Sequence, residues 1–110
     1  MEHVTTDQDG FAVTAVTGDV DFNSSPELRT VLLELIEARR DVLVDMSAVS
    51  YIDSSGVASL IEAYQTAKSL NTRFGLVAGG GTPLRVLQVA RLEKIFPMYP
   101  TVADGVAAKA

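Results

Sequence analysis

Two adjacent hydroxyl side chains stand where a helix is expected to begin. Ser54 and Ser55 lie between Asp53 and Gly56, after an apolar strand and a short polar loop at 47–50. The first turn of a helix has backbone N–H groups without intrahelical partners and the positive end of the helix dipole, so it stabilises an added phosphoryl group. These hydroxyls are therefore candidate phosphate acceptors. The simpler interpretation is that Asp53 and both serines are helix-capping residues.

Other site chemistries find little support in the sequence. The chain has no cysteine, so it can form no disulfide, zinc–thiolate site or redox thiol. Its single histidine, His3, lies in the terminal segment, and no Gly-x-Ser-x-Gly nucleophile elbow is present. The run 79–81 is all glycine but lacks the Gly-Lys-Ser/Thr ending of a P-loop, so we expect a flexible connection. We predict no metal site, no cofactor and no enzymatic activity.

The composition is that of one globular domain. The chain has 110 residues, of which 47% are hydrophobic and 21% charged, so residues 1–110 are expected to form one domain around a single core. The net charge is −5 and the basic residues do not cluster beyond Arg39 and Arg40, which makes nucleic acid a poor candidate partner. No apolar run approaches the ~20 residues that span a bilayer, and no leader pattern is seen, so a cytoplasmic protein is expected.

Hydrophobic periodicity predicts the elements that position the two serines. Strands are predicted at 2–6, 11–17, 42–44, 74–78 and 95–97, and helices at 26–37, 57–70, 84–90 and 102–108. The first two strands should form a hairpin, and strands joined through helices should be parallel. We therefore expect an α/β fold: a mixed, mostly parallel sheet of four to five strands with about four helices.

Residues with known end preferences mark the predicted helix termini. A capping serine and Pro26 open the first helix within the run Ser24-Ser25-Pro26-Glu27, and Asn71 suits the C-terminal end of the second. Thr82 is the predicted N-cap of the third helix, and Pro83 its first residue. Thr101 and Asp104 resemble a capping box at the start of the last helix.

Four short motifs, spread over most of the chain, have counterparts in one protein family. Gly18–Asp21 reads Gly-Asp-Val-Asp, similar to a Gly-Glu-Leu-Asp motif, and Pro26 with Leu28 matches a Pro-x-Leu helix start. Val44–Ser47 together with Ile52–Val57 is similar to the pattern apolar-Asp-apolar-x … apolar-Asp-Ser-Ser/Thr-Gly-Leu. In these motifs the chain resembles the STAS domains, and within them the bacterial anti-sigma factor antagonists.

This resemblance implies a function and a set of site residues. In the members that switch, the first hydroxyl after the aspartate is phosphorylated, which carries over to Ser54. The kinase implied is an anti-sigma factor that uses ATP to phosphorylate serine and also sequesters a sigma factor; a phosphatase would reverse the modification. The unphosphorylated domain, a monomer or weak dimer, would bind the kinase and release the sigma factor. The implied partner-binding residues are Asp21, Asn23, Ser24, Asp53, Ser54, Ser55 and Gly56, although Asp21 and Asn23 could equally be ordinary turn formers.

The choice between the two serines is left open by the residues themselves. At about 100° per residue, Ser55 falls almost opposite the apolar stripe centred between Leu60 and Ile61, whereas Ser54 falls near its edge, so periodicity favours Ser55. A residue at or beside the cap has non-helical dihedrals, however, so the wheel does not fix the direction of Ser54. The resemblance favours Ser54, with Ser55 as the second candidate.

Other roles within the same family are alternatives to the sigma-factor switch. They are a scaffold subunit of a signalling complex, a regulator of another output, and the soluble component of a lipid transporter. The intact run 53–56 favours a phosphorylation switch over the transporter type. One departure concerns Ala90-Arg91-Leu92, where the family often has Ser/Thr-Gly-Leu; a charged residue in place of a permissive glycine predicts a differently shaped loop.

Overall fold

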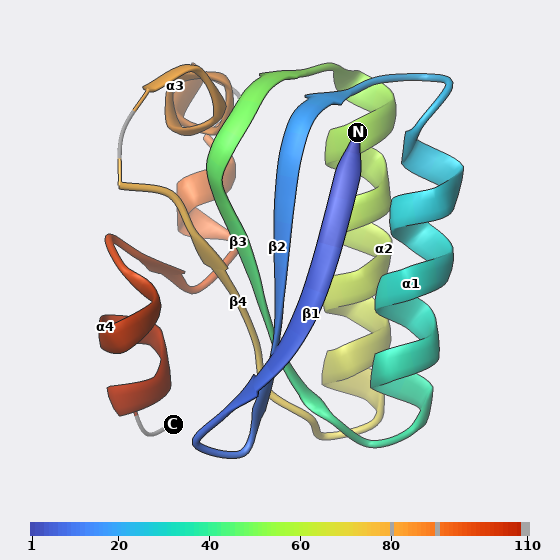
Figure 1. Cartoon of the computed structure of the whole chain (residues 1–110), viewed down its shortest axis with the longest axis vertical. Helices are drawn as coiled ribbons and strands as arrows, with labels where there is room; N and C mark the ends of the chain where they lie inside the picture. The colour runs from blue at the N-terminus through green and yellow to red at the C-terminus, as the bar shows by residue number, and fades with distance from the viewer. Residues whose placement is uncertain (80, 90, 109–110) are drawn as a thin grey trace.

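A mixed sheet runs through the middle of the molecule (Figure 1). The computed structural model describes residues 1–79, 81–89 and 91–108. Within these residues the sheet has the order β1-β2-β3-β4-β5. β1 is antiparallel to β2, and the other neighbouring pairs are parallel, which confirms the predicted hairpin and the mostly parallel sheet. The strands are β1 (Glu2–Gln8), β2 (Phe11–Val20), β3 (Asp41–Ile52), β4 (Phe74–Val77) and β5 (Met98–Tyr99).

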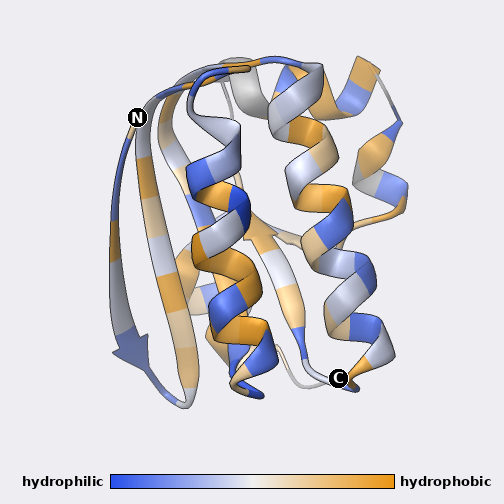
Figure 2. Ribbon diagram, turned by 90° about the vertical axis from the view of Figure 1, so that its right-hand side faces the viewer, coloured by the Kyte–Doolittle hydropathy of each residue, from blue (hydrophilic) through white to orange (hydrophobic). Residues whose placement is uncertain are grey.

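Helices cover both faces of this sheet. α1 (Ser25–Glu37) and α2 (Ser54–Ser69) lie side by side on one face, and α4 (Val102–Ala107) lies on the other (Figure 1). α3 (Gly81–Val89) packs against β3 and is followed by a 3₁₀ turn over Leu92–Lys94. Apolar and polar bands alternate along α1 and α2 in Figure 2, as expected for helices with one face on a sheet. The α/β fold with about four helices is confirmed.

The central strands are buried on both sides. Val42, Leu43 and Val44 of β3 are at most 1% exposed, as their unbroken apolar run predicts. The alternating sequence at 11–17 is typical of a half-buried strand, but residues Phe11–Thr14 of β2 are all buried. Both faces of this strand are covered: Phe11 and Val13 pack with Val102 and Val106 of α4, whereas Ala12 belongs to the core under α1 and α2. Because α4 is distant from β2 in the sequence, the local pattern of β2 does not predict that α4 covers it.

The predicted strand at 42–44 is much longer in the structure. β3 continues to Ile52, so the predicted polar loop at 47–50 is strand. It continues because β2 extends to Val20 and keeps pairing with it, through two register shifts in the ladder. These shifts are the irregularities that β-bulges introduce, and they admit polar residues without ending the pair.

The last strand also lies elsewhere than predicted. β5 is Met98–Tyr99 instead of 95–97, and Ile95 follows the 3₁₀ turn. Pro97 precedes the strand and contributes only its carbonyl, which accepts from the backbone N–H of Leu76 at 2.9 Å. A proline has no N–H for a ladder, which explains why the strand begins after it.

Two of the predicted helix ends are confirmed and a third is shifted. Asn71 has φ +60° after α2, and the N–H groups of Asn71 and Thr72 bond back to Lys68 and Ala67, as in a Schellman motif. Thr101 caps α4 by accepting from the Asp104 N–H at 3.1 Å, but the Asp104 carboxylate bonds the threonine hydroxyl instead of completing the box.

The third helix begins earlier than expected. α3 starts at Gly81, so Thr82 is inside the helix, while Gly80 of the glycine run and Ala90 lie outside the described residues. Arg91 has φ +59° and ψ +26°, the left-handed conformation for which a glycine would be permissive. The arginine therefore adopts that conformation despite its side chain, at a cost of roughly 1 kcal/mol.

Candidate functional site

The candidate site is the junction between β3 and α2. Asp53 is the N-cap residue of α2, with extended dihedrals (φ −104°, ψ −174°). Its Oδ1 accepts from the backbone N–H groups of Ser55 (2.9 Å) and Gly56 (3.1 Å). The predicted capping role of Asp53 is confirmed. As a consequence, two of the N–H groups that the sequence argument offered to a phosphate are already bonded to this carboxylate.

The same carboxylate joins a second loop to the site. Oδ2 of Asp53 accepts from the backbone N–H of Phe22 at 3.0 Å, and the backbone N–H of Asp53 donates to the Val20 carbonyl at 3.1 Å. The β2–α1 loop is thereby held beside the start of α2, although the two are about thirty positions apart in sequence. The structure thus brings together the predicted residues of both segments.

Asp21 organises the β2–α1 loop. Its Oδ1 accepts from the backbone N–H groups of Asn23 (3.0 Å) and Ser24 (3.1 Å), an Asx turn. The bond from the Ser24 N–H is the main reason that the pKa of Asp21 is lowered from its ordinary value. The turn-forming role of Asp21 is therefore confirmed.

The sequence predicts a capping serine within the run Ser24-Ser25-Pro26-Glu27, and the residue at the start of α1 is Ser24. It occupies the N-cap position of α1 but makes no side-chain capping bond. Its hydroxyl instead accepts from the Asp21 N–H at 2.9 Å and lies 3.1 Å from the Asp19 carbonyl. The hydroxyl is diverted into the preceding turn because Ser24 already has helical dihedrals (φ −98°, ψ −23°), whereas a capping side chain needs extended backbone.

The two serines differ in exposure, in the opposite sense to the helical wheel. Ser54 is exposed and Ser55 is half-buried. Ser59, one turn after Ser55, is buried and lies within hydrogen-bond distance of the carbonyls of Ser25 in α1 and of Ser55. The row that contains Ser55 therefore faces α1. The helical wheel is based only on the side of α2 that packs on the sheet. It therefore assigns to solvent the side of α2 that α1 covers.

Gly56 is a buried member of the predicted set. A Cβ at this position would lie 2.7 Å from Ile52 Cγ1, 2.8 Å from Val20 Cγ1 and 3.0 Å from the Val20 carbonyl oxygen. Only glycine permits α2 to start this close to β2 and β3. Gly56 thus sets the position of the two serines and offers no surface of its own.

Phe22 is a surface residue of the site that the sequence analysis does not single out. It is 75% exposed and lies between Asp21 and Asn23, and its backbone N–H donates to the Asp53 carboxylate. A phenylalanine inside a predicted turn is the signal that could have identified it. Exposed aromatic residues of this kind are frequent energetic centres of protein interfaces.

The surroundings of the site are acidic. Asp19, Asp21 and Glu27 line a shallow depression of about 450 Å³ next to the loop that Asp53 holds. Across residues 1–79, 81–89 and 91–108, no three His, Cys, Asp or Glu side chains are arranged to hold a metal ion. No helix in the same part of the chain is long and apolar enough to cross a membrane. The loop beside the start of α2 carries negative charge before any phosphate is added.

The chain is similar in sequence to a known domain family and to curated proteins. A model of the STAS domain family matches residues 3–105. The anti-sigma-F factor antagonist RsfB of Mycobacterium tuberculosis is 28% identical over 100 residues, which cover 90% of this chain and 81% of RsfB. The anti-sigma-B factor antagonist of Staphylococcus aureus is 38% identical over 68 residues, 61% of this chain and 60% of that protein.

A solved structure gives the same result in three dimensions. The crystal structure of an anti-sigma factor antagonist from Mycobacterium paratuberculosis matches with a TM-score of 0.89 at 30% identity, over 96% of this chain and 91% of that one. The resemblance of the four motifs is therefore confirmed over nearly the whole length. The chain belongs to the STAS domain family.

Proposed function

We propose that this domain is an anti-sigma factor antagonist whose choice of partner is switched by phosphorylation of Ser54. The observation that carries the proposal is an exposed serine directly after a capping aspartate, at the head of α2, in a chain whose relatives are named anti-sigma factor antagonists. The expected partners are an anti-sigma factor that is itself a serine kinase and a phosphatase that resets the switch. The domain acts by binding, without an enzymatic activity of its own.

The switch operates through charge at the interface. A phosphoserine carries about −1.5 to −2 charges at neutral pH. On Ser54 this charge would lie beside the Asp53 carboxylate, which already bonds the N–H groups of Ser55 and Gly56. The phosphate would therefore extend toward solvent, and a partner surface shaped for a neutral hydroxyl would meet a hydrated anion. The fold stays the same and the affinity falls.

The site is tested by phosphorylation with a cognate anti-sigma factor that has serine kinase activity. Incubation with ATP, followed by intact-mass analysis and peptide mapping, should place one phosphate on the wild type and on Ser55→Ala, and none on Ser54→Ala. Phosphate found solely on Ser55 would overturn the assignment.

The consequence for binding is tested with the same kinase as the titrant. Ser54→Ala should bind like the unphosphorylated wild type, whereas Ser54→Asp should bind at least tenfold more weakly, about 1.4 kcal/mol. Ser55→Asp is the matched control, because it adds the same charge one residue away on the half-buried serine, and it should have the smaller effect. Equal affinity of Ser54→Ala and Ser54→Asp would contradict a charge-based switch.

A further inference from the structure

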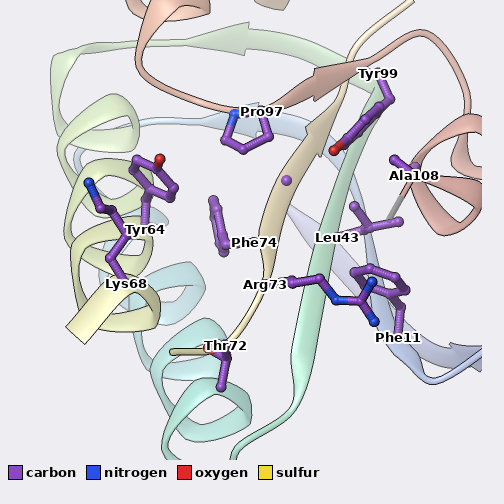
Figure 3. A pocket seen from close by; sticks show the side chains of 12 residues that line it. Phe11, Leu43, Tyr64, Lys68, Thr72, Arg73, Phe74, Pro97, Tyr99 and Ala108 are labelled. Atoms are coloured by element: carbon purple, nitrogen blue, oxygen red, sulfur yellow. The ribbon is translucent and has the colours of Figure 1, made fainter. Parts of the chain in front are cut away.

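A second concave site lies at the opposite end of α2. A pocket of about 220 Å³ lies beside β4, with Tyr64 and Lys68 of α2 on one side and residues of β5 and α4 on the other (Figure 3). At 1.5 Å per residue, Lys68 is about 21 Å along the helix from Ser54. The pocket is therefore separate from the candidate switch, and no step of the proposed function uses it.

Aromatic and aliphatic side chains form the walls of this pocket. Figure 3 shows the Tyr64 and Tyr99 rings on two sides, with the edge of Phe74 between them. Phe74 also lies against Tyr64, with ring centroids 5.9 Å apart. Leu43 of β3 closes the floor and is only 1% exposed. These walls favour a flat, apolar ligand.

Two glycines bring the elements around the pocket close together. A Cβ on Gly75 would lie 2.8 Å from the Tyr99 ring, and a Cβ on Gly105 would lie 2.8 Å from Leu43 Cδ1. Both glycines line the pocket: Gly75 lets the Tyr99 ring lie close to β4, and Gly105 lets α4 lie close to β3. At about 220 Å³, the pocket is smaller than the ~300–1,000 Å³ typical of sites for drug-sized ligands, which restricts the occupant to a single ring with a short chain.

Two cations stand at the rim, and they differ in how far their charge is compensated. The Arg73 guanidinium bonds Asp41 Oδ2 at 3.0 and 3.1 Å and stacks 4.7 Å from the centroid of Phe11. The Lys68 ammonium lies 5.7 Å from the centroid of Tyr64, and none of the ion pairs found among the described residues includes it. In a chain of net charge −5, Lys68 places a positive charge beside an apolar cleft.

We propose that this pocket binds a small aromatic monocarboxylate, with the ring between Tyr64 and Tyr99 and the carboxylate at Lys68. One anionic group matches the one uncompensated cation at the rim. A phosphate ester is disfavoured because its recognition calls for several free donors, and Asp41 already engages the guanidinium of Arg73. A nucleotide is too large for the volume.

The test is a titration followed by ¹H–¹⁵N correlation spectra, with phenylacetate as the probe. Saturable shifts are expected at the amides of Thr72, Gly75 and Gly105. The neutral analogue 2-phenylethanol keeps the ring and should bind at least tenfold more weakly. Lys68→Gln should weaken phenylacetate binding at least tenfold, and Lys68→Arg should retain it.

The controls separate this pocket from the proposed switch. Lys68 is exposed, so its variants are expected to fold. Lys94→Gln removes another exposed lysine that does not line the pocket and should titrate like the wild type, as should Ser54→Asp. Absence of saturable shifts, equal affinity for the acid and the alcohol, or unchanged binding by Lys68→Gln would each overturn the proposal. None of these results bears on Ser54.

Discussion

The two ends of α2 are built in contrasting ways. At the Ser54 end, the Asp53 carboxylate accepts from three backbone N–H groups, one in the β2–α1 loop and two in the first turn of α2, and Gly56 lies against the backbone of Val20. At the Lys68 end, the helix finishes in backbone hydrogen bonds at Asn71, and large rings surround a space of about 220 Å³. The first end has no spare volume, and the second has room for side chains to adjust.

This difference suits the two roles proposed for the ends. A switch residue must present one hydroxyl at a fixed place, so that adding a phosphate changes the surface and not the position. A pocket for a small ligand instead needs rings that can move a little to enclose it. Substitutions that add or remove a few atoms at each end measure how rigid each one is.

The largest expected difference comes from adding one methyl group at each end. Gly56→Ala should lower the free energy of unfolding by about 2 kcal/mol, because the new Cβ would meet two branched side chains and the Val20 carbonyl, none of which can retreat. Gly75→Ala should cost less than about 1 kcal/mol, because its Cβ would meet ends of the Tyr99 and Leu43 side chains, which border free space. Urea unfolding of both variants measures the two values.

A control defines the baseline for this pair. Alanine is ordinarily better than glycine within a helix by about 1 kcal/mol, so a loss on Gly56→Ala is opposite in sign to helix propensity. Ala58→Ser, at an exposed position of the same helix, should change stability by less than about 0.5 kcal/mol. If Gly75→Ala proved as costly as Gly56→Ala, the pocket end would be as closely packed as the switch end.

A smaller difference is expected from the polar side chains that finish the helix. Asp53→Ala should lower the free energy of unfolding by about 1–2 kcal/mol, since it removes the cap of α2 and its bond to Phe22. Thr72→Val should cost about 0.5 kcal/mol or less, because the Thr72 hydroxyl lies a long 3.4 Å from the Ala67 carbonyl and the backbone bond between these residues remains.

Two further measurements test the capping role of Asp53: the stability of Asp53→Asn and the hydrogen exchange of the α2 amides. Asp53→Asn keeps an acceptor oxygen and should lose less than Asp53→Ala. Hydrogen exchange should show the first turn of α2 opening in Asp53→Ala, with the last turn protected as in the wild type. A uniform loss of protection along α2 would mean that its two ends do not behave independently.

The two ends also differ in how far sequence alone predicts them. The switch end consists of two contiguous motifs, 18–24 and 53–56, whose cap and turn chemistry is local, so the capping role of Asp53 and the turn-forming role of Asp21 could be predicted directly. The pocket end is assembled from side chains of six separate segments, which only the tertiary fold brings together. The residues that line it include Phe11, Leu43, Tyr64, Phe74, Tyr99 and Gly105.

Tertiary packing also explains the errors at the switch end and in the sheet. Ser55 is half-buried because α1 covers a flank of α2 that the wheel assigned to water. β3 reaches Ile52 because β2 continues beside it, although residues 47–50 read as a polar loop. In each case a neighbour distant in sequence overrides a local preference.

The smallest effect is expected from the acid dependence of the switch end. The bond from Ser24 lowers the pKa of Asp21 below its ordinary value of 3.8, so the folded state holds its proton less tightly than the unfolded chain. The stability that Asp21 contributes is therefore complete above pH 3.8 and is lost as the pH falls through its lower folded pKa. Asp21→Asn should make the loss of stability below about pH 4 shallower, in urea unfolding measured at a series of pH values.

Asp19→Asn is the matched control, because the Asp19 carboxylate accepts no hydrogen bond among the described residues, and it should leave the slope unchanged. Equal slopes for both variants and the wild type would mean that the turn around Asp21 persists in the unfolded chain, and that this part of the switch end is not fixed by the fold.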